Sequence, residues 1–257
     1  MRPAHTVRTR AMQLKRLAAN YLYYTAKPHA LNPIHYARVV NDRKIDAHMR
    51  QHHPALYEVV REMAPTGSTG CSFSDYWELY SWVRRNAPLW VLECGSGISS
   101  GVIATALAEN ARGRLISLDE SRSYVDRAAD RLPPQLRQWV EFHHSELGSQ
   151  RYAGLPGIFY RDVPEHPYEF VFVDGPAGPP RSPSVEKPFN SDFINLLVRT
   201  PDRPVAALID QRITTLWAFR QLMPKARIRY YPTKRVTHVV AHRSDLLPTL
   251  VSGGPAC

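Results

Sequence analysis

Short apolar runs alternate with helical segments after Pro88, and this alternation constrains the fold more than any other feature of the chain. Turn residues bound each run, and the runs are Leu89–Cys94, Leu115–Asp119, Trp139–His143, Phe170–Asp174 and Val205–Asp210. Apolar residues at helical spacing follow the first, second and fourth runs, whereas residues 145–169 have weak periodicity and are expected to be mostly loop. Strands that alternate with helices form right-handed βαβ units, so we expect a mostly parallel sheet with helices on both faces.

Two further strand-like runs, Arg227–Tyr231 and Val236–Ala241, follow this pattern, with only four residues between them. A connection this short cannot hold a crossover helix, so the two strands are expected to be antiparallel. The expected fold is therefore an α/β three-layer sandwich around a seven-stranded, mostly parallel sheet that ends in an antiparallel hairpin.

The segment before Pro88 is expected to be helical. Residues 64–70 (APTGSTG) have the composition of a linker, which predicts a basic N-terminal helical arm over 1–63 and a second domain over 64–257. A helix over 42–63 is expected to restart at Pro54, because proline suits a first helical turn and breaks an interior. Ser72 and Asp75 have the spacing of a capping box, which predicts the start of a helix.

Positive charge is concentrated in the arm. Residues 1–41 hold seven Lys and Arg and no Asp or Glu, in a chain of 257 residues with a net charge of +10. One helical face of the arm is apolar and consists of Leu14, Leu17, Ala18, Tyr21 and Leu22. We favour docking of this face on the domain with the charges in solvent; nucleic acid and an acidic membrane surface stay open as alternative partners.

The lengths of the apolar runs and the number and spacing of the cysteines indicate the kind of cellular compartment in which this chain is found. No run approaches the roughly 20 residues that span a bilayer. Cys71, Cys94 and Cys257 form no disulfide framework and lack the spacing of a zinc site, which is typical of a reducing compartment. We expect a cytoplasmic protein; an Arg-rich opening without acids is also typical of a mitochondrial presequence, and that alternative stays open.

A glycine-rich turn, ECGSGISSG over residues 93–101, connects the first expected strand to a helix. Glycine lets the backbone turn tightly and lets a ligand approach it, and the helix N-terminus offers free N–H groups. Ser100 replaces the third glycine of a dinucleotide-binding loop, which disfavours a nicotinamide cofactor. Glu93 would repel a pyrophosphate but attract a cation, and Asp119 ends the second strand, where an acid accepts hydrogen bonds from ribose hydroxyls. These residues favour a cationic nucleoside ligand.

With this loop, the chain from about Leu89 to His242 resembles the class I S-adenosylmethionine-dependent methyltransferases. The resemblance rests on the E-x-G-x-G loop, on Asp119-Glu120, on His144-Ser145-Glu146 and on FVFVDGP over 170–176. It implies a Rossmann-like fold and S-adenosylmethionine as the cofactor. The implied cofactor-binding residues are Glu93, Gly95 and Gly97 at the methionine end, Asp119 at the ribose with Glu120 beside it, and Ser145 or Glu146 near the adenine. Ser99 and Asp174 are also expected to contact the cofactor.

Two carboxylates are expected side by side at the strand ends. Asp174 ends the fourth strand, and Asp210 ends the fifth and is followed by Gln211, a set of oxygen ligands that suits Mg²⁺. The set resembles that of metal-dependent O-methyltransferases, in which Asn stands where this chain has Gln211. Alternatively, Asp210 caps a helix and Asp174 orients the turn at Gly175. We expect Asp174 to be catalytic.

The acceptor is expected to be a hydroxyl of a small molecule or saccharide, because VDGP resembles small-molecule O-methyltransferases more than NPPY-type enzymes. The proline-rich segment 175–188 is expected to be a substrate-facing lid or a stiff surface loop. His143, His144 and His238 are weaker candidates for a general base. An RNA methyltransferase, a non-catalytic binding module of the same fold and an aminopropyl transferase stay open as alternatives.

Overall fold

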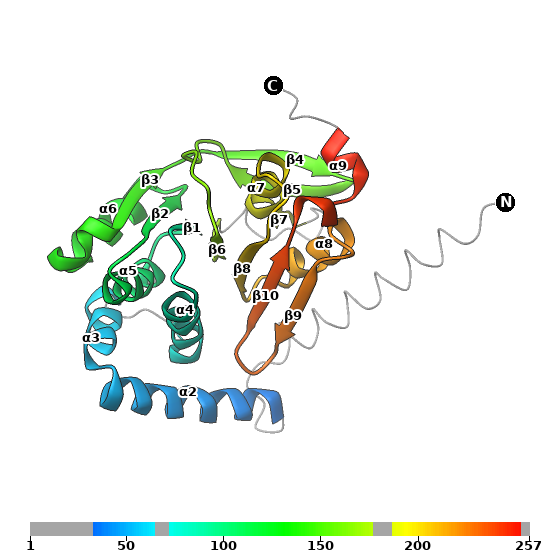
Figure 1. Ribbon diagram of the computed structural model, residues 1–257. Helices are drawn as coiled ribbons and strands as arrows, with labels where there is room; N and C mark the ends of the chain where they lie inside the picture. The colour runs from blue at the N-terminus through cyan, green and yellow to red at the C-terminus, as the bar shows by residue number, and fades with distance from the viewer. Residues whose placement is uncertain (1–32, 65–71, 177–186, 253–257) are drawn as a thin grey trace.

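The computed structural model describes residues 33–64, 72–176 and 187–252, and its centre is a seven-stranded sheet. The strand order is β3-β2-β1-β6-β8-β10-β9, with β10 antiparallel to both of its neighbours and the other pairings parallel. The strands of this sheet are β1 (Trp90–Cys94), β2 (Arg114–Asp119), β3 (Val140–His144), β6 (Phe170–Val173), β8 (Val205–Asp210), β9 (Arg227–Tyr231) and β10 (Val236–Ala241). The predicted mostly parallel sheet with its C-terminal hairpin is confirmed (Figure 1).

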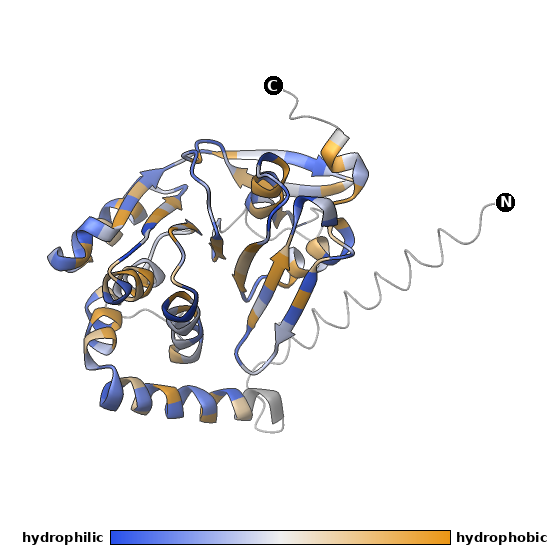
Figure 2. Ribbon diagram, in the orientation of Figure 1, coloured by the Kyte–Doolittle hydropathy of each residue, from blue (hydrophilic) through white to orange (hydrophobic). Residues whose placement is uncertain are grey.

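Helices cover both faces of the sheet, as the alternation predicts. They are α2 (Pro33–His52), α3 (Pro54–Met63), α4 (Phe73–Asn86), α5 (Ile98–Asn110), α6 (Arg122–Arg131), α7 (Asp192–Arg199), α8 (Ile213–Leu222) and α9 (Pro248–Ser252). Helices α3, α4 and α5 share one apolar cluster with the face of β1 that carries Val91. Helices α7 and α8 pack with the opposite face, which carries Leu92 and Cys94. Figure 2 shows hydrophobic residues concentrated on the central strands between these two layers.

The segment that connects β3 to β6 differs from the expected loop. It forms a hairpin of β4 (Leu147–Tyr152) and β5 (Leu155–Tyr160), and β5 pairs in parallel with the short strand β7 (Phe189–Asn190). The hairpin buries Tyr152 and Tyr160, both at most 3% exposed, in the same cluster as α7 and α8. The alternation of apolar and polar residues is weak in this hairpin because Gly148, Gly154 and Gly157 interrupt it. A second, three-stranded sheet therefore shares an apolar cluster with one face of the main sheet.

The N-terminal helices pack directly on the domain. Helix α2 contacts α4 and α3 contacts α5, and Met49 and Leu56 are fully buried there. The break at Pro54 is confirmed, and so is the start of a helix after Ser72, since α4 begins at Phe73 with Ser72 as its N-cap residue. The side-chain bonds of the predicted capping box are absent, because the Ser72 hydroxyl donates to Asp42 Oδ1 at 2.8 Å. Thus α2 is tied to the start of α4 by a polar contact as well as by apolar ones.

Several predictions lie outside the described residues: the helix over 14–22, the linker (except Ala64), Cys71, Cys257 and most of the proposed lid. The division at residue 64 stays a prediction. Among the residues that the structure describes, none of the helices has the length and hydrophobicity needed to cross a bilayer.

Gly101 permits the close contact between α3 and α5. A Cβ at this position would lie 2.9 Å from Val59 Cγ1 and in steric conflict with the Met63 sulfur. Both neighbours are buried, at 7% and 4% exposure, so neither can move away without disturbing the core. The absence of a side chain at this helical position is therefore a packing requirement.

We predict that Gly101→Ala lowers the free energy of unfolding, although alanine normally favours a helix over glycine by about 1 kcal/mol. The steric conflict should outweigh that gain and leave a net loss of about 1–2 kcal/mol, measured by urea unfolding. Gly97→Ala, at the N-cap of the same helix, is the comparison variant and should lose less, because a Cβ there has no neighbour within 4 Å and only the N-cap preference for glycine is lost. Equal losses for the two variants would contradict the packing role of Gly101.

Candidate functional site

The carboxyl ends of five strands bring most of the predicted site residues to one edge of the sheet (Figure 1). The chain proceeds outward from β1 to β2 and β3, then returns to place β6 on the other side of β1. Ligands bind α/β sheets at such a switch point, in the crevice beyond the strand ends. The predicted residues found along this edge are Glu93, Gly95, Asp119, Glu120, Ser145, Asp174 and Asp210.

Two glycines meet at the switch point. Gly95 has a φ of +100°, and a Cβ on it would lie 2.6 Å from the backbone nitrogen of Gly175. A Cβ on Gly175 would in turn lie 2.6 Å from the Cα of Gly95 and from the phenol oxygen of Tyr160. The glycine loop after β1 therefore touches the exit of β6, and both glycines are sterically required.

Glu93 lies beneath this loop and is fully buried. Its Oε2 accepts hydrogen bonds from Ser100 Oγ at 2.5 Å and from Ser117 Oγ at 2.6 Å, while its Oε1 has no partner among the described residues. Burial raises the pKa of Glu93 to about 7, although the serine hydroxyls oppose the shift. Ser100, which replaces the third glycine of a dinucleotide loop, thus holds the acid in place.

Asp119 connects the glycine loop to the end of β2. Its Oδ2 accepts the N–H of Ser96 at 3.1 Å, and its Oδ1 accepts the N–H of Ser121 at 2.8 Å. The carboxyl is 7% exposed, and burial raises its pKa above the ordinary value. Asp119 is therefore fixed beside the loop, in the position expected of an acid that holds a ribose.

Glu120, Ser145 and Glu146 differ in whether another residue already forms a hydrogen bond with the side chain. Glu120 Oε2 accepts the phenol of Tyr160 at 2.8 Å. Ser145 is fully buried and its hydroxyl accepts the N–H of Asp162 at 2.9 Å, so it is already engaged, whereas Glu146 is exposed. Sequence reasoning missed Tyr160 because it lies in the segment expected to be loop.

The strand ends proposed as a metal site hold two guanidinium groups. Arg212 places Nη2 3.9 Å from Asp174 Oδ1 and donates through Nη1 to the carbonyl of Pro176 at 2.6 Å. Gln211 Oε1 accepts Arg235 Nη1 at 2.8 Å. Asp210 Oδ1 is buried without a partner among the described residues, and burial together with the nearby carboxyls of Asp174 and Asp75 raises its pKa well above the ordinary value.

This donor set does not fit Mg²⁺. The amide oxygen of Gln211 is engaged by Arg235, and the Arg212 guanidinium faces Asp174, where a metal ion would have to bind. Within residues 33–64, 72–176 and 187–252, no cluster of three or more His, Cys, Asp or Glu has the geometry of a metal site. Arg212 directly follows Gln211 in the sequence, but the sequence does not indicate that the Arg212 side chain points toward Asp174.

The histidines named as candidate bases have other contacts. His144 Nε2 lies 3.2 Å from the Glu120 carbonyl, and His143 lies 3.8 Å from the Glu141 carboxylate. His238 Nε2 lies 2.9 Å from Glu78 Oε1, on β10 beside α4. Of the acids at the carboxyl ends of β1, β2, β6 and β8, Asp174 is the exposed one, with a side chain that is 49% exposed.

No protein-family profile and no curated protein sequence matches the chain. Solved structures do match. A putative caffeoyl-CoA O-methyltransferase from Staphylococcus aureus is 11% identical, over 78% of this chain and 98% of that one, with a TM-score of 0.54. An O-methyltransferase from Bacillus cereus in complex with S-adenosylhomocysteine is 15% identical, over 77% of this chain and 96% of that one, with a TM-score of 0.50. At this level of identity the similarity is one of fold.

We predict that Glu93→Gln changes how stability depends on pH. An acid whose pKa is raised from 4.5 to about 7 on folding keeps its proton in the native state, so its contribution is fully present below pH 4.5 and is lost as the pH rises to 7. Glutamine stays neutral, so the variant should gain roughly 1–3 kcal/mol over the native protein between pH 5 and pH 8. Urea unfolding at the two pH values measures this difference, and a constant offset would show that Glu93 is ionised in the native state.

Proposed function

We propose that this chain, which has the fold of the class I methyltransferases, is an S-adenosylmethionine-dependent O-methyltransferase that acts on a hydroxyl of a small molecule or saccharide. The observation that carries the proposal is the contact between the Gly95 loop and Gly175 at the switch point, with Asp119 fixed beside the loop. This arrangement offers backbone N–H groups, an acid for a ribose and a carboxylate for a cation along one crevice.

In this proposal the cofactor lies along the edge from β6 to β3. Gly95, Gly97 and Ser99 line its methionine end, Asp174 attracts its positive charge, and Glu93 holds the loop in place from beneath through Ser100. Asp119 and Glu120 hold the ribose hydroxyls, and the adenine lies near Ser145 and Glu146. Because the Ser145 hydroxyl is engaged by Asp162, we propose that it shapes the adenine site rather than donating to the base.

Methyl transfer is an in-line displacement in which the acceptor oxygen forms a bond to the methyl carbon, the carbon–sulfur bond breaks and its electron pair stays on sulfur. The acceptor must lose its proton, and Asp174 is the carboxylate at the crevice that we propose accepts it. Arg212, next to Asp174, supplies the positive charge that stabilises the developing oxyanion. This proposal needs no divalent cation.

Cofactor binding tests the first part of the proposal. We predict micromolar binding of S-adenosylhomocysteine by calorimetry, weakened roughly 10- to 100-fold by Asp119→Asn because hydrogen bonds to a charged group are lost. Asp126→Asn, an exposed acid on α6, is the control and should bind normally. Asp174→Asn should still bind the product cofactor but abolish transfer to any acceptor found in a screen of hydroxylated metabolites and saccharides. Absence of binding by the native protein would overturn the enzyme assignment.

The role of Arg212 is tested without an acceptor by Mn²⁺ titration, followed by electron paramagnetic resonance in saturating S-adenosylhomocysteine. We predict that the spectrum of free Mn²⁺ is unchanged by the native protein, because the guanidinium occupies the cation position. Stoichiometric loss of the free signal would show a metal site and contradict this role. Once an acceptor is known, EDTA should leave turnover unchanged, and Arg212→Met should lower it by about 10²-fold.

A further inference from the structure

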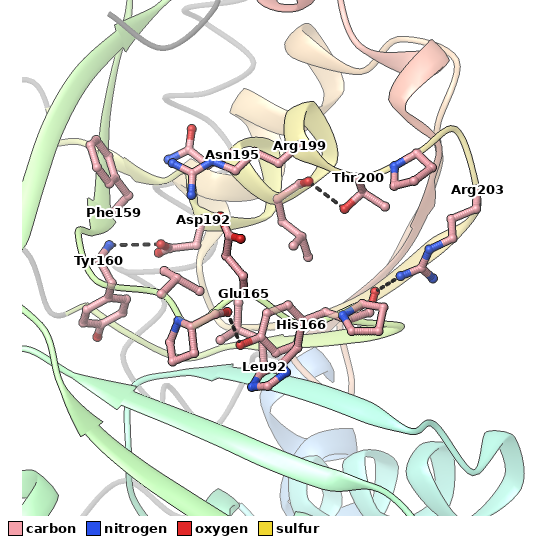
Figure 3. A pocket seen from close by; sticks show the side chains of 16 residues that line it. Leu92, Phe159, Tyr160, Glu165, His166, Asp192, Asn195, Arg199, Thr200 and Arg203 are labelled. Carbon is pink, nitrogen blue, oxygen red and sulfur yellow. Dashed lines mark hydrogen bonds between the residues drawn. The ribbon is translucent and has the colours of Figure 1, made fainter. Parts of the chain in front are cut away.

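A cavity of about 410 Å³ lies away from the crevice, between the β5 end of the hairpin, the loop before β6 and helix α7 (Figure 3). Its size is that of small-molecule sites in other proteins. Tyr160 separates it from the proposed cofactor site: its ring lines the cavity, while its hydroxyl donates to Glu120 at the edge of the sheet. The cavity is thus not part of the site described above.

The walls of the cavity are apolar and partly aromatic. Phe159, Tyr168, Val163 and Leu196 line it, and His166 stacks on Trp90 at 3.7 Å between ring centroids. The Tyr168 hydroxyl donates to the Pro164 carbonyl, which fixes the loop that forms one wall. A flat, apolar molecular body fits such a lining.

The polar groups on the wall formed by α7 are donors. Asn195 Oδ1 accepts the hydroxyl of Tyr152 at 2.6 Å, which leaves the amide N–H₂ as the free end of that side chain. Arg199 follows at i+4 on the same helical face and is exposed, with no ion-pair partner among the described residues. Arg203 adds a third donor, although one of its nitrogens already donates to the carbonyl of Tyr168 at 2.8 Å.

The acids of the cavity do not cancel these cations. Asp192 is 3% exposed and both of its carboxyl oxygens are occupied, by the N–H of Tyr160 at 3.0 Å and by Asn190 Nδ2 at 2.7 Å. Glu165 is exposed to solvent. On the wall formed by α7, which does not include Glu165, the free hydrogen-bonding capacity is therefore that of donors with positive charge, which matches an acceptor group with negative charge.

We propose that this cavity is a binding site for a small organic anion with a flat apolar body, of the aromatic carboxylate class. The ring system lies between Tyr168, Leu196 and Phe159, and the carboxylate accepts hydrogen bonds from Arg199 and Asn195. The site is independent of the proposed methyl transfer, because Tyr160 lies between the two.

The test uses the full chain and 1-naphthoate as the probe, with the neutral 1-naphthamide as its matched analogue, and measures binding by calorimetry with and without saturating S-adenosylhomocysteine. We expect 1-naphthoate to bind in the micromolar range whether or not the cofactor product is present, and 1-naphthamide to bind at least about fivefold more weakly. Undetectable binding at millimolar 1-naphthoate, equal binding of the amide, or displacement by S-adenosylhomocysteine would each overturn the proposal.

Two variants locate the site. Arg199→Gln should weaken 1-naphthoate about fivefold without affecting 1-naphthamide, and Leu196→Trp should abolish both by filling the cavity. Arg122→Gln, an exposed cation on α6, is the control for loss of one charge. Each variant is first checked for an unchanged circular dichroism spectrum and melting temperature. If folded Arg199→Gln and Leu196→Trp both bind 1-naphthoate like the native protein, the molecule binds elsewhere and the assignment is wrong.

Discussion

The contact between Gly95 and Gly175 is the constraint on which the geometry of the proposed site depends. The loop after β1 and the exit of β6 approach so closely that neither position accepts a Cβ. Backbone hydrogen bonds hold them together, since the carbonyl of Cys94 accepts the N–H of Asp174 at 2.9 Å and that of Gly175. The strand order places these two turns side by side, and the glycines let them close. Asp174 is thereby fixed next to the glycine loop.

Around this contact, the acids have polar partners, which limit the cost of desolvation where the acid is buried. Glu93 has two serine hydroxyls, Asp119 has two backbone N–H groups, and Asp174 has Arg212. Polar contacts also connect the β9–β10 hairpin to α4, because Glu78 of α4 lies against Lys234 and His238. These contacts lower the pKa of Glu78 to about 2. The edge of the sheet is therefore held by polar contacts from the helices as well as by the strands.

The main sheet was predictable from the sequence because its strands are short apolar runs with turn residues at both ends, a pattern that depends only on burial. All seven runs became strands, within about a residue. The β4–β5 hairpin was not predictable, because its glycines and exposed polar residues weaken the alternation. Side-chain partners were the hardest to foresee. Ser72 has the spacing of a helix cap, yet its hydroxyl bonds Asp42, thirty residues earlier in the chain. The packing of α2, and not the local sequence, determines this partner.

The turn after β8 shows why a ligand set cannot be read from residue types alone. Gln211 has a φ of +44°, in the left-handed region, and its N–H donates to the carbonyl of Arg235 at 3.0 Å. Its side chain bonds the same arginine, so Gln211 faces the hairpin. The next residue, Arg212, turns toward Asp174 instead. The left-handed conformation of Gln211 thus directs its own side chain toward the hairpin, and Arg212 lies next to the carboxylate of Asp174. The carboxylate therefore faces a guanidinium and not an amide oxygen, so this edge of the sheet carries its own cation at the position proposed for a metal ion.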